Sequence, residues 1–154
     1  MLSELEIQKI NAELAHCTTR QSGSVEALRI VQTHRGWISD DSLGDIATLL
    51  EMTVDELDAV ATFYNFIFRK PVGRHVIVIC DSISCWVMGY EPLADILKRN
   101  LSITFGETTQ DMRFTLLPGS CLGACDRAPA MLVDGDLYGP VTANMLDEIL
   151  GKYQ

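Results

Sequence analysis

Basic residues are scarce in this 154-residue chain, and their scarcity excludes several classes of protein. Twelve lysines and arginines stand against 21 aspartates and glutamates, which gives a net charge of −9. The excess of negative charge is evenly distributed, because the net charge is −5 over residues 1–70 and −4 over residues 71–154. A protein that binds nucleic acid or an anionic membrane surface needs a basic stripe or patch. We therefore expect no nucleic-acid partner.

Long apolar runs are missing too. No uninterrupted apolar stretch approaches the roughly 20 residues that a transmembrane helix needs. The N-terminal segment carries Glu4, Glu6 and Glu13 among its apolar residues and lacks the basic-then-apolar order of a signal peptide. We expect a cytoplasmic protein without direct membrane insertion, in a compartment that keeps thiols reduced.

The glycine-rich motifs of nucleotide-binding proteins are also absent. The sequence has no G-x-G-x-x-G, no Walker-type phosphate loop and no catalytic Ser/His/Asp order. Nothing in it binds NADH or a flavin unaided. Its three histidines, His16, His34 and His75, lie outside the cysteine segments. This position disfavours a mixed histidine and cysteine cluster of the Rieske type.

Four of the five cysteines form two close pairs: Cys80 with Cys85, and Cys121 with Cys125. The first pair is a C-x4-C in VIVICDSISCW and the second a C-x3-C in LLPGSCLGACDRAP. Each pair follows an apolar β-type run, at residues 75–79 and 114–117, so we predict both pairs in loops at strand ends. Two such strands side by side would bring four thiolates to one place.

Four converging thiolates suit a metal centre, either an iron–sulfur cluster or a structural zinc site. Zinc pairs usually form tight C-x2-C turns, whereas the wider spacings here fit a longer two-iron cluster. Gly119, Gly123 and Ala124 surround the second pair, and small residues let backbone N–H groups approach sulfur. These features favour iron–sulfur over zinc. Disulfides are the third alternative, and a reducing compartment argues against them.

Residues 1–70 are predicted to form a small helical bundle. Apolar residues recur near helical spacing in four segments. Candidate N-caps mark their starts: Ser3, Ser24, the cluster at 40–42, and Thr53. Ser3 and Thr53 each precede a glutamate by three residues, which is the capping-box spacing, and Gly36 ends the second helix. The bundle is interpreted as scaffold and partner surface.

An aromatic segment follows the bundle, and it contains Phe63, Tyr64, Phe66 and Phe68. We interpret these side chains as packing the bundle against the second half of the chain. The alternative is that some of them line a docking surface. Residues 71–74, with a proline and a glycine, are the predicted joint between two domains, 1–70 and 71–154.

Residues 71–154 alternate strand and helix patterns. We predict strands at 75–79, 114–117, 130–133 and 137–138, and helices at 90–100 and 142–152. Asp134-Gly135 is the expected hairpin turn. The layout is α/β, with a mixed sheet and a helix on each face, as in a thioredoxin-like unit. The predicted fold class of the whole chain is α+β, a small helical bundle followed by this domain.

With these motifs placed, the sequence resembles the small two-iron, thioredoxin-like ferredoxin subunit of respiratory complex I, the NADH:quinone oxidoreductase. Four stretches carry the resemblance: ALRIVQTHRGWIS (27–39), VATFYNFIFRKPVGRH (60–75), CDSISC (80–85) with GETTQDMRF (106–114), and CLGACDRAP (121–129). Two departures are visible, because Ser39 stands where the family often has proline and Cys17 has no counterpart. Pro129 occupies the place where thioredoxin-like folds often carry a cis-proline, and the sequence leaves the isomer open.

The resemblance implies one [2Fe-2S] cluster ligated by Cys80, Cys85, Cys121 and Cys125. It also implies a partner subunit that binds NADH and FMN, further peripheral-arm subunits, and a place peripheral to the inner membrane through the complex. The whole complex passes electrons from NADH through FMN and iron–sulfur centres to quinone and translocates protons. This chain would be an electron carrier without turnover of its own.

Three alternative functions stay open at this stage. The equivalent diaphorase subunit of an NAD-linked hydrogenase or formate dehydrogenase would share the same motifs. An interaction module built on a four-thiolate zinc site would have no redox role. A dithiol oxidoreductase on a thioredoxin-like scaffold is disfavoured, because the chain lacks C-x-x-C.

Overall fold

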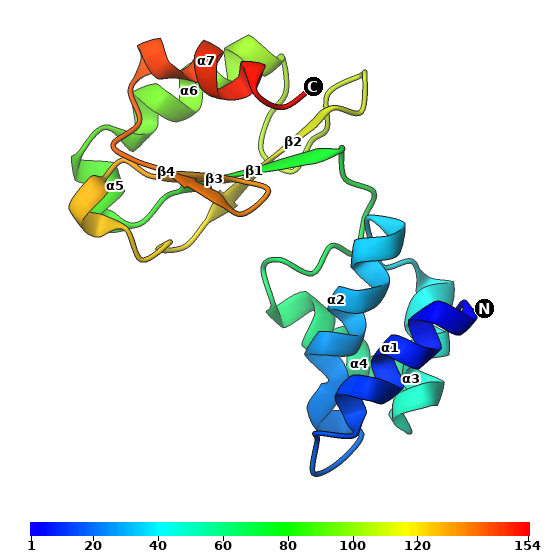
Figure 1. Cartoon of the computed structure of the whole chain (residues 1–154). Coiled ribbons are helices and arrows are strands. Elements are labelled where there is room, and N and C mark those ends of the chain that lie inside the picture. Colours follow the sequence, from blue (N-terminus) through cyan, green and yellow to red (C-terminus); the bar gives the residue numbers. More distant parts are fainter. The chain divides into compact units, whose positions relative to one another are not determined.

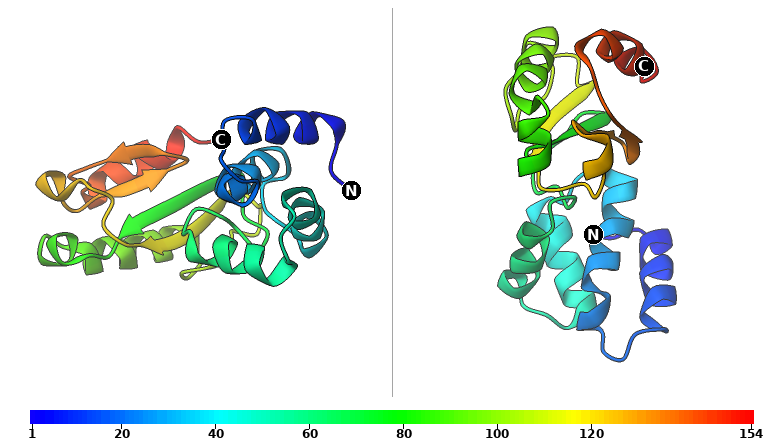
Figure 2. Two further views of the ribbon diagram at one scale, coloured as in Figure 1. Left: turned by 90° about the horizontal axis from the view of Figure 1, so that it is seen from below. Right: turned by 90° about the vertical axis from the view of Figure 1, so that its left-hand side faces the viewer.

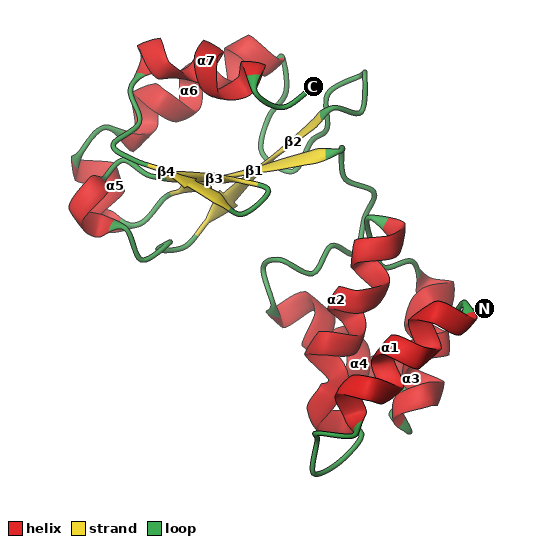
Figure 3. Cartoon of the chain, viewed as in Figure 1, coloured by secondary structure: helices red, strands yellow, loops and turns green.

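The computed structural model describes all residues from 1 to 154, and the chain divides into two compact units. The helical unit is Met1–Pro71 and the sheet unit is Val72–Gln154. No helix in either unit has the length and apolar character needed to cross a membrane. Figures 1 and 3 show the helices of the first unit and the sheet with its helices in the second.

The helical unit contains four α-helices around one apolar core: α1 (Glu4–Leu14), α2 (Ser24–Arg35), α3 (Asp40–Leu50) and α4 (Val54–Phe63). A short 3-10 turn, η1 (Gln21–Gly23), precedes α2. Every helix contributes to the core, with Ile10 from α1, Leu28 from α2, Ile46 from α3 and Leu57 from α4 all fully buried. The bundle therefore has the amphipathic packing that its apolar spacing predicts.

The two capping boxes predicted in this unit are confirmed. Ser3 and Glu6 cap α1, and Thr53 and Glu56 cap α4, each through reciprocal side-chain and backbone hydrogen bonds. Gly36 ends α2 as predicted, with a φ of 83° that favours glycine.

Two other predicted N-caps are wrong. Ser24 is the first residue of α2 and is buried, so the preceding Gly23 takes the cap position. Helix α3 begins after Ser39, whose hydroxyl accepts a hydrogen bond from the Ser42 N–H. Asp40 lies in the first turn instead, where a carboxylate interacts favourably with the helix dipole. Ser39, the departure from the family pattern, is thus a helix cap.

The sheet unit has four strands in the order β2-β1-β3-β4. They are β1 (His75–Cys80), β2 (Phe114–Gly119), β3 (Met131–Val133) and β4 (Asp136–Tyr138). Strands β1 and β2 are parallel, whereas β3 is antiparallel to both β1 and β4, so the predicted mixed sheet is confirmed. Asp134 and Gly135, with φ of 52° and 99°, make the predicted turn.

The predicted placement of a helix on each face of the sheet is wrong, because α6 (Tyr90–Leu101) and α7 (Leu146–Gly151) cover the same face (Figures 1 and 2). Alternate strand residues point to one face, and one core joins these to both helices: Ile77, Ile79, Phe114, Leu116, Met131 and Val133 with Leu93, Leu97, Leu146 and Ile149. An amphipathic pattern tells which side of a helix is apolar but not which sheet face it will cover.

Short helical segments complete the sheet unit: α5 (Ile83–Val87), η2 (Cys125–Arg127) and η3 (Ala143–Met145). The bond between Ala128 and Pro129 is cis, which answers the question that the sequence left open, and Gly139–Pro140 is cis as well. The Val141 N–H donates to the Pro129 carbonyl at 2.9 Å, which ties these two segments together.

Candidate metal centre

The parallel pairing of β1 and β2 brings the two cysteine pairs to the same edge of the sheet. Cys80 is the last residue of β1 and pairs in register with Gly119, two residues before Cys121. The Asp81 N–H donates to the Gly119 carbonyl at 2.9 Å and holds the strand ends together. Since Ile79 faces α6 and α7, alternation turns Cys80 to the opposite face. The strands lie side by side, as predicted.

Cys85 does not lie in a loop as predicted, because it belongs to the five-residue helix α5. Its side chain is 1% exposed and packs with Cys80 and three alanines, Ala124, Ala128 and Ala130. The remaining large residues of α5 and its end are apolar yet exposed, so this helix has no amphipathic period that sequence reasoning could detect. Cys125 likewise opens the 3-10 turn η2.

The four sulfurs form an inner and an outer pair. The inner pair, Cys80 and Cys85, is buried, and each thiol affects the ionisation of the other. The outer pair, Cys121 and Cys125, is exposed, and its Sγ atoms lie 3.4 Å apart. Charge on Cys80 acts on both outer thiols, so the two pairs are electrostatic neighbours. All four are free thiols.

Within the inner pair, one thiol ionises more easily than the other. Burial opposes ionisation of Cys80, but hydrogen bonds from the Ser82 hydroxyl and from the Ser82 and Leu122 backbone outweigh it and lower its pKa. Burial and then the neighbouring Cys80 sulfur raise the pKa of Cys85 to about 11. The inner pair therefore holds a proton that a metal would have to displace.

In the outer pair, too, one thiol ionises more easily than the other. The Gly123 N–H, 3.4 Å from the Cys121 sulfur, and then the Cys125 thiol lower the pKa of Cys121. The hydrogen bond with Cys121 raises the pKa of Cys125. Small residues around the outer pair thus do bring a backbone donor to sulfur, as the composition of the segment predicts.

Other candidate ligands lie elsewhere. No group of three or more His, Cys, Asp or Glu side chains, the four paired cysteines included, is arranged so that it could hold a single metal ion. Cys17 belongs to the helical unit, where its thiol contacts the Glu13 carbonyl at 3.6 Å. His75 begins β1, at the end of the strand opposite Cys80, and its Nδ1 lies 2.6 Å from a carboxylate oxygen of Asp134. Its ring packs against Phe114 and Tyr153.

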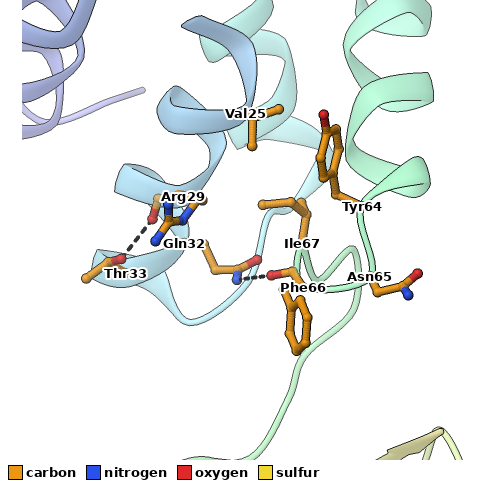
Figure 4. Close-up of a pocket in the computed structure, with 8 residues that line it drawn as sticks. All are labelled: Val25, Arg29, Gln32, Thr33, Tyr64, Asn65, Phe66 and Ile67. Carbon is orange, nitrogen blue, oxygen red and sulfur yellow. Dashed lines mark hydrogen bonds between the residues drawn. The ribbon is translucent and has the colours of Figure 1, made fainter. Parts of the chain in front are cut away.

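The aromatic segment forms a hollow on the helical unit, between α2 and residues 64–67 (Figure 4). The hollow has a volume of about 530 Å³. Gln32 fixes one wall, because its amide donates to the Phe66 carbonyl at 2.7 Å and accepts from the Phe68 N–H at 2.6 Å. Phe63, Tyr64 and Phe66 are 79%, 45% and 51% exposed. In the helical unit taken by itself, these three aromatic side chains are therefore exposed.

Comparison with known proteins decides the family. Residues 9–154 match the family model of the thioredoxin-like [2Fe-2S] ferredoxins. The chain belongs to this family. The fold class and the resemblance predicted from the sequence are therefore confirmed, and the family indicates one [2Fe-2S] cluster as the cofactor.

Two bacterial relatives resemble this ferredoxin over nearly its whole length. A subunit of the NADH-quinone oxidoreductase of Pseudomonas aeruginosa is 43% identical over 153 residues, 99% of this chain and 92% of the relative. The NADH-quinone oxidoreductase subunit of the same name from Escherichia coli strain K12 is 44% identical with the same coverage.

A solved structure is similar as well. An NAD+-reducing [NiFe]-hydrogenase in the H2-reduced state aligns with a TM-score of 0.73 and 28% identity. The alignment covers 86% of this ferredoxin but only 22% of the hydrogenase chain, so the likeness concerns one part of a longer protein.

The residues present fit the cofactor of the family. Four cysteine thiolates are the usual ligands of a [2Fe-2S] cluster, and each iron takes two of them. Here two sulfur pairs stand at one edge of a sheet, one buried and one exposed, with hydroxyl and backbone donors beside them. All four candidate ligand atoms are therefore cysteine sulfurs.

Proposed function

We propose that this chain is the electron-transfer subunit of the NADH-oxidising module of an NADH-quinone oxidoreductase. Its one [2Fe-2S] cluster would be ligated by Cys80, Cys85, Cys121 and Cys125. The observation that carries the proposal is the pairing of β1 with β2, which brings both cysteine pairs to one edge of the sheet. The Pseudomonas and Escherichia relatives, similar over almost the whole chain, support the assignment to this complex.

When bound, the cluster supplies a one-electron couple, and the chain's residues determine where it lies and how it is solvated. The inner pair, packed among alanines, excludes water from one side of the site. The outer pair keeps the other side at the surface, where an electron can enter. The Gly123 N–H and the Ser82 hydroxyl orient sulfur lone pairs and offset negative charge.

The chain needs a partner that delivers electrons, because it carries no nucleotide or flavin motif. We assign that role to the subunit that binds NADH and FMN, with the remaining peripheral-arm subunits beyond it. Helix α5 supports a partner surface next to the site, since Ile83, Trp86, Val87 and Met88 are 53% to 72% exposed. The complex would operate on the cytoplasmic side, with this chain peripheral to the membrane.

A second candidate is the diaphorase subunit of an NAD-linked hydrogenase or formate dehydrogenase. The structural similarity to the NAD+-reducing hydrogenase, at a TM-score of 0.73, supports this second candidate. The site would perform the same one-electron transfer in both settings. The genes that neighbour this one would distinguish the two, because only a hydrogenase or formate dehydrogenase operon encodes the corresponding catalytic subunit.

Metal and sulfide analysis of anaerobically purified protein tests the proposal. We expect two irons and two acid-labile sulfides per chain, a red-brown colour, and an electron paramagnetic resonance signal after reduction. A colourless protein with one zinc per chain would instead identify a structural zinc module and would overturn the electron-transfer role.

A further inference from the structure

Ser82 is an N-cap residue whose hydroxyl is not used for capping. It precedes α5 in extended conformation, yet its side chain makes no hydrogen bond to the helix. The hydroxyls of Ser3, Ser39 and Thr53 all accept from a backbone N–H of the helix that they precede, as N-cap serine and threonine usually do. The Ser82 hydroxyl lies 3.2 Å from the Cys80 sulfur instead.

The hydroxyl therefore lies beside the buried cysteine pair, at the end of β1. A cysteine bound to iron has lost its proton and can only accept, so with the cluster in place the hydroxyl must donate. Its one hydrogen is then directed at the Cys80 sulfur.

We propose that Ser82 is a positioning residue that raises the reduction potential of the cluster by donating its hydroxyl hydrogen to the Cys80 sulfur. The inference rests on the proposed function, which makes Cys80 a cluster ligand. Reduction by the partner's flavin adds one electron and moves no proton at Ser82. Since the reduced form is more negative, a donor to its ligand sulfurs stabilises it more than the oxidised form.

The test is a redox titration of the full chain with dithionite, followed by electron paramagnetic resonance. In Ser82→Ala we expect the ratio of reduced to oxidised cluster, at the wild-type midpoint potential, to fall about tenfold, which for one electron is about 59 mV. Ser82→Thr keeps a hydroxyl and should stay close to wild type. Ser39→Ala is the matched control, because it removes a capping hydroxyl from α3 and should leave the potential unchanged.

A second measurement and a second variant keep the test decisive. In D2O, pulsed resonance should detect deuterons coupled to the wild-type cluster, with that of the Gly123 N–H among them, and Ser82→Ala should lose one of these couplings. Ser82→Gly also removes the hydroxyl, and glycine is well tolerated at an N-cap. Loss of the cluster from both hydroxyl-free variants would overturn the proposal, because the hydroxyl would then hold the cluster rather than tune it.

The failures of the two proposals can be told apart. Wild-type protein without iron and sulfide would refute the proposed function. A normal cluster whose potential and deuteron coupling are the same in wild type and Ser82→Ala would refute the role of Ser82 alone.

Discussion

Gly139 packs directly against the backbone of Arg127. A Cβ added to Gly139 would overlap the Arg127 carbonyl oxygen and lie 3.2 Å from the Arg127 Cβ. Arg127 ends η2, the turn that Cys125 opens. The segment after β4 therefore supports the outer cysteine pair from behind, and only a residue without a side chain allows this approach.

Gly139→Ala should displace η2 and weaken cluster binding. The overlap is with backbone, which cannot move aside like a flexible side chain, so we expect a loss of about 1–3 kcal/mol in unfolding free energy. Iron content per chain should fall together with Tm. Full iron content at wild-type Tm would contradict the close packing.

Gly44→Ala is the matched control for that experiment. Gly44 lies inside α3, and a Cβ there would meet nothing within 4 Å. Alanine should therefore stabilise the helix by about 1 kcal/mol and leave the cluster intact. A loss of iron in this variant as well would mean that glycine replacement in general, not the contact with Arg127, disturbs the site.

Cys121→Ser should lose the cluster or make it labile, whereas Cys17→Ser should leave the visible spectrum unchanged. Cys121 belongs to the outer pair, but Cys17 lies in the helical unit, where its thiol contacts the Glu13 carbonyl. Serine is nearly isosteric with cysteine, so the fold itself should persist in both. Absorption spectra and sulfide content measure the outcome, and equal losses in the two variants would show that the ligands are wrongly assigned.

Val87→Asp should weaken association with the proposed flavin-binding partner without unfolding the chain. Val87 is 68% exposed on α5, beside the cysteine site, so a charge there costs little in the isolated chain but is unfavourable in an apolar contact. Co-purification with the partner would measure the loss. Val54→Asp is the control, since Val54 is 49% exposed in the first turn of α4, where an acidic residue is tolerated.

The sequence predicts the sheet and the meeting of the cysteine pairs because both depend on local signals. Apolar runs mark β1 and β2, and parallel pairing then puts their ends at one edge. Helix α5 could not be predicted, because the helix is too short to show a period and its exposed residues are apolar. The shared face of α6 and α7 also depends on tertiary packing, which amphipathic spacing does not encode.

The role of Ser82 shows a similar limit of sequence reasoning. A serine before a helical segment predicts an N-cap, and Ser3 and Thr53 follow that rule. Ser82 departs from it because a thiol of the preceding strand end lies within hydrogen-bonding distance. The hydrogen-bond partner of the Ser82 hydroxyl is therefore determined by the tertiary structure and not by the residues next to it in the sequence.

The stability of the helical unit should fall in acid because of one ion pair. Arg35 contacts both carboxylate oxygens of Glu6, at 2.8 Å and 2.7 Å, and Glu6 is 2% exposed. The hydrogen bond from Arg35, with those from Ser3, outweighs burial and lowers the pKa of Glu6 from 4.5 to about 2. Because the unfolded chain takes up this proton first, stability is complete above about pH 4.5 and is lost as pH falls toward 2.

Chemical denaturation between pH 2 and 5 measures this loss, which at about 1.4 kcal/mol per pKa unit amounts to about 3 kcal/mol. Glu6→Gln should be less stable than wild type at pH 7, and its stability should depend less on pH in this window, since it has no carboxylate to protonate. Glu56→Gln is the control, because Glu56 is exposed and its pKa is lowered by hydrogen bonds from Thr53 alone. Identical pH profiles for wild type and Glu6→Gln would show that the pair with Arg35 does not govern acid stability.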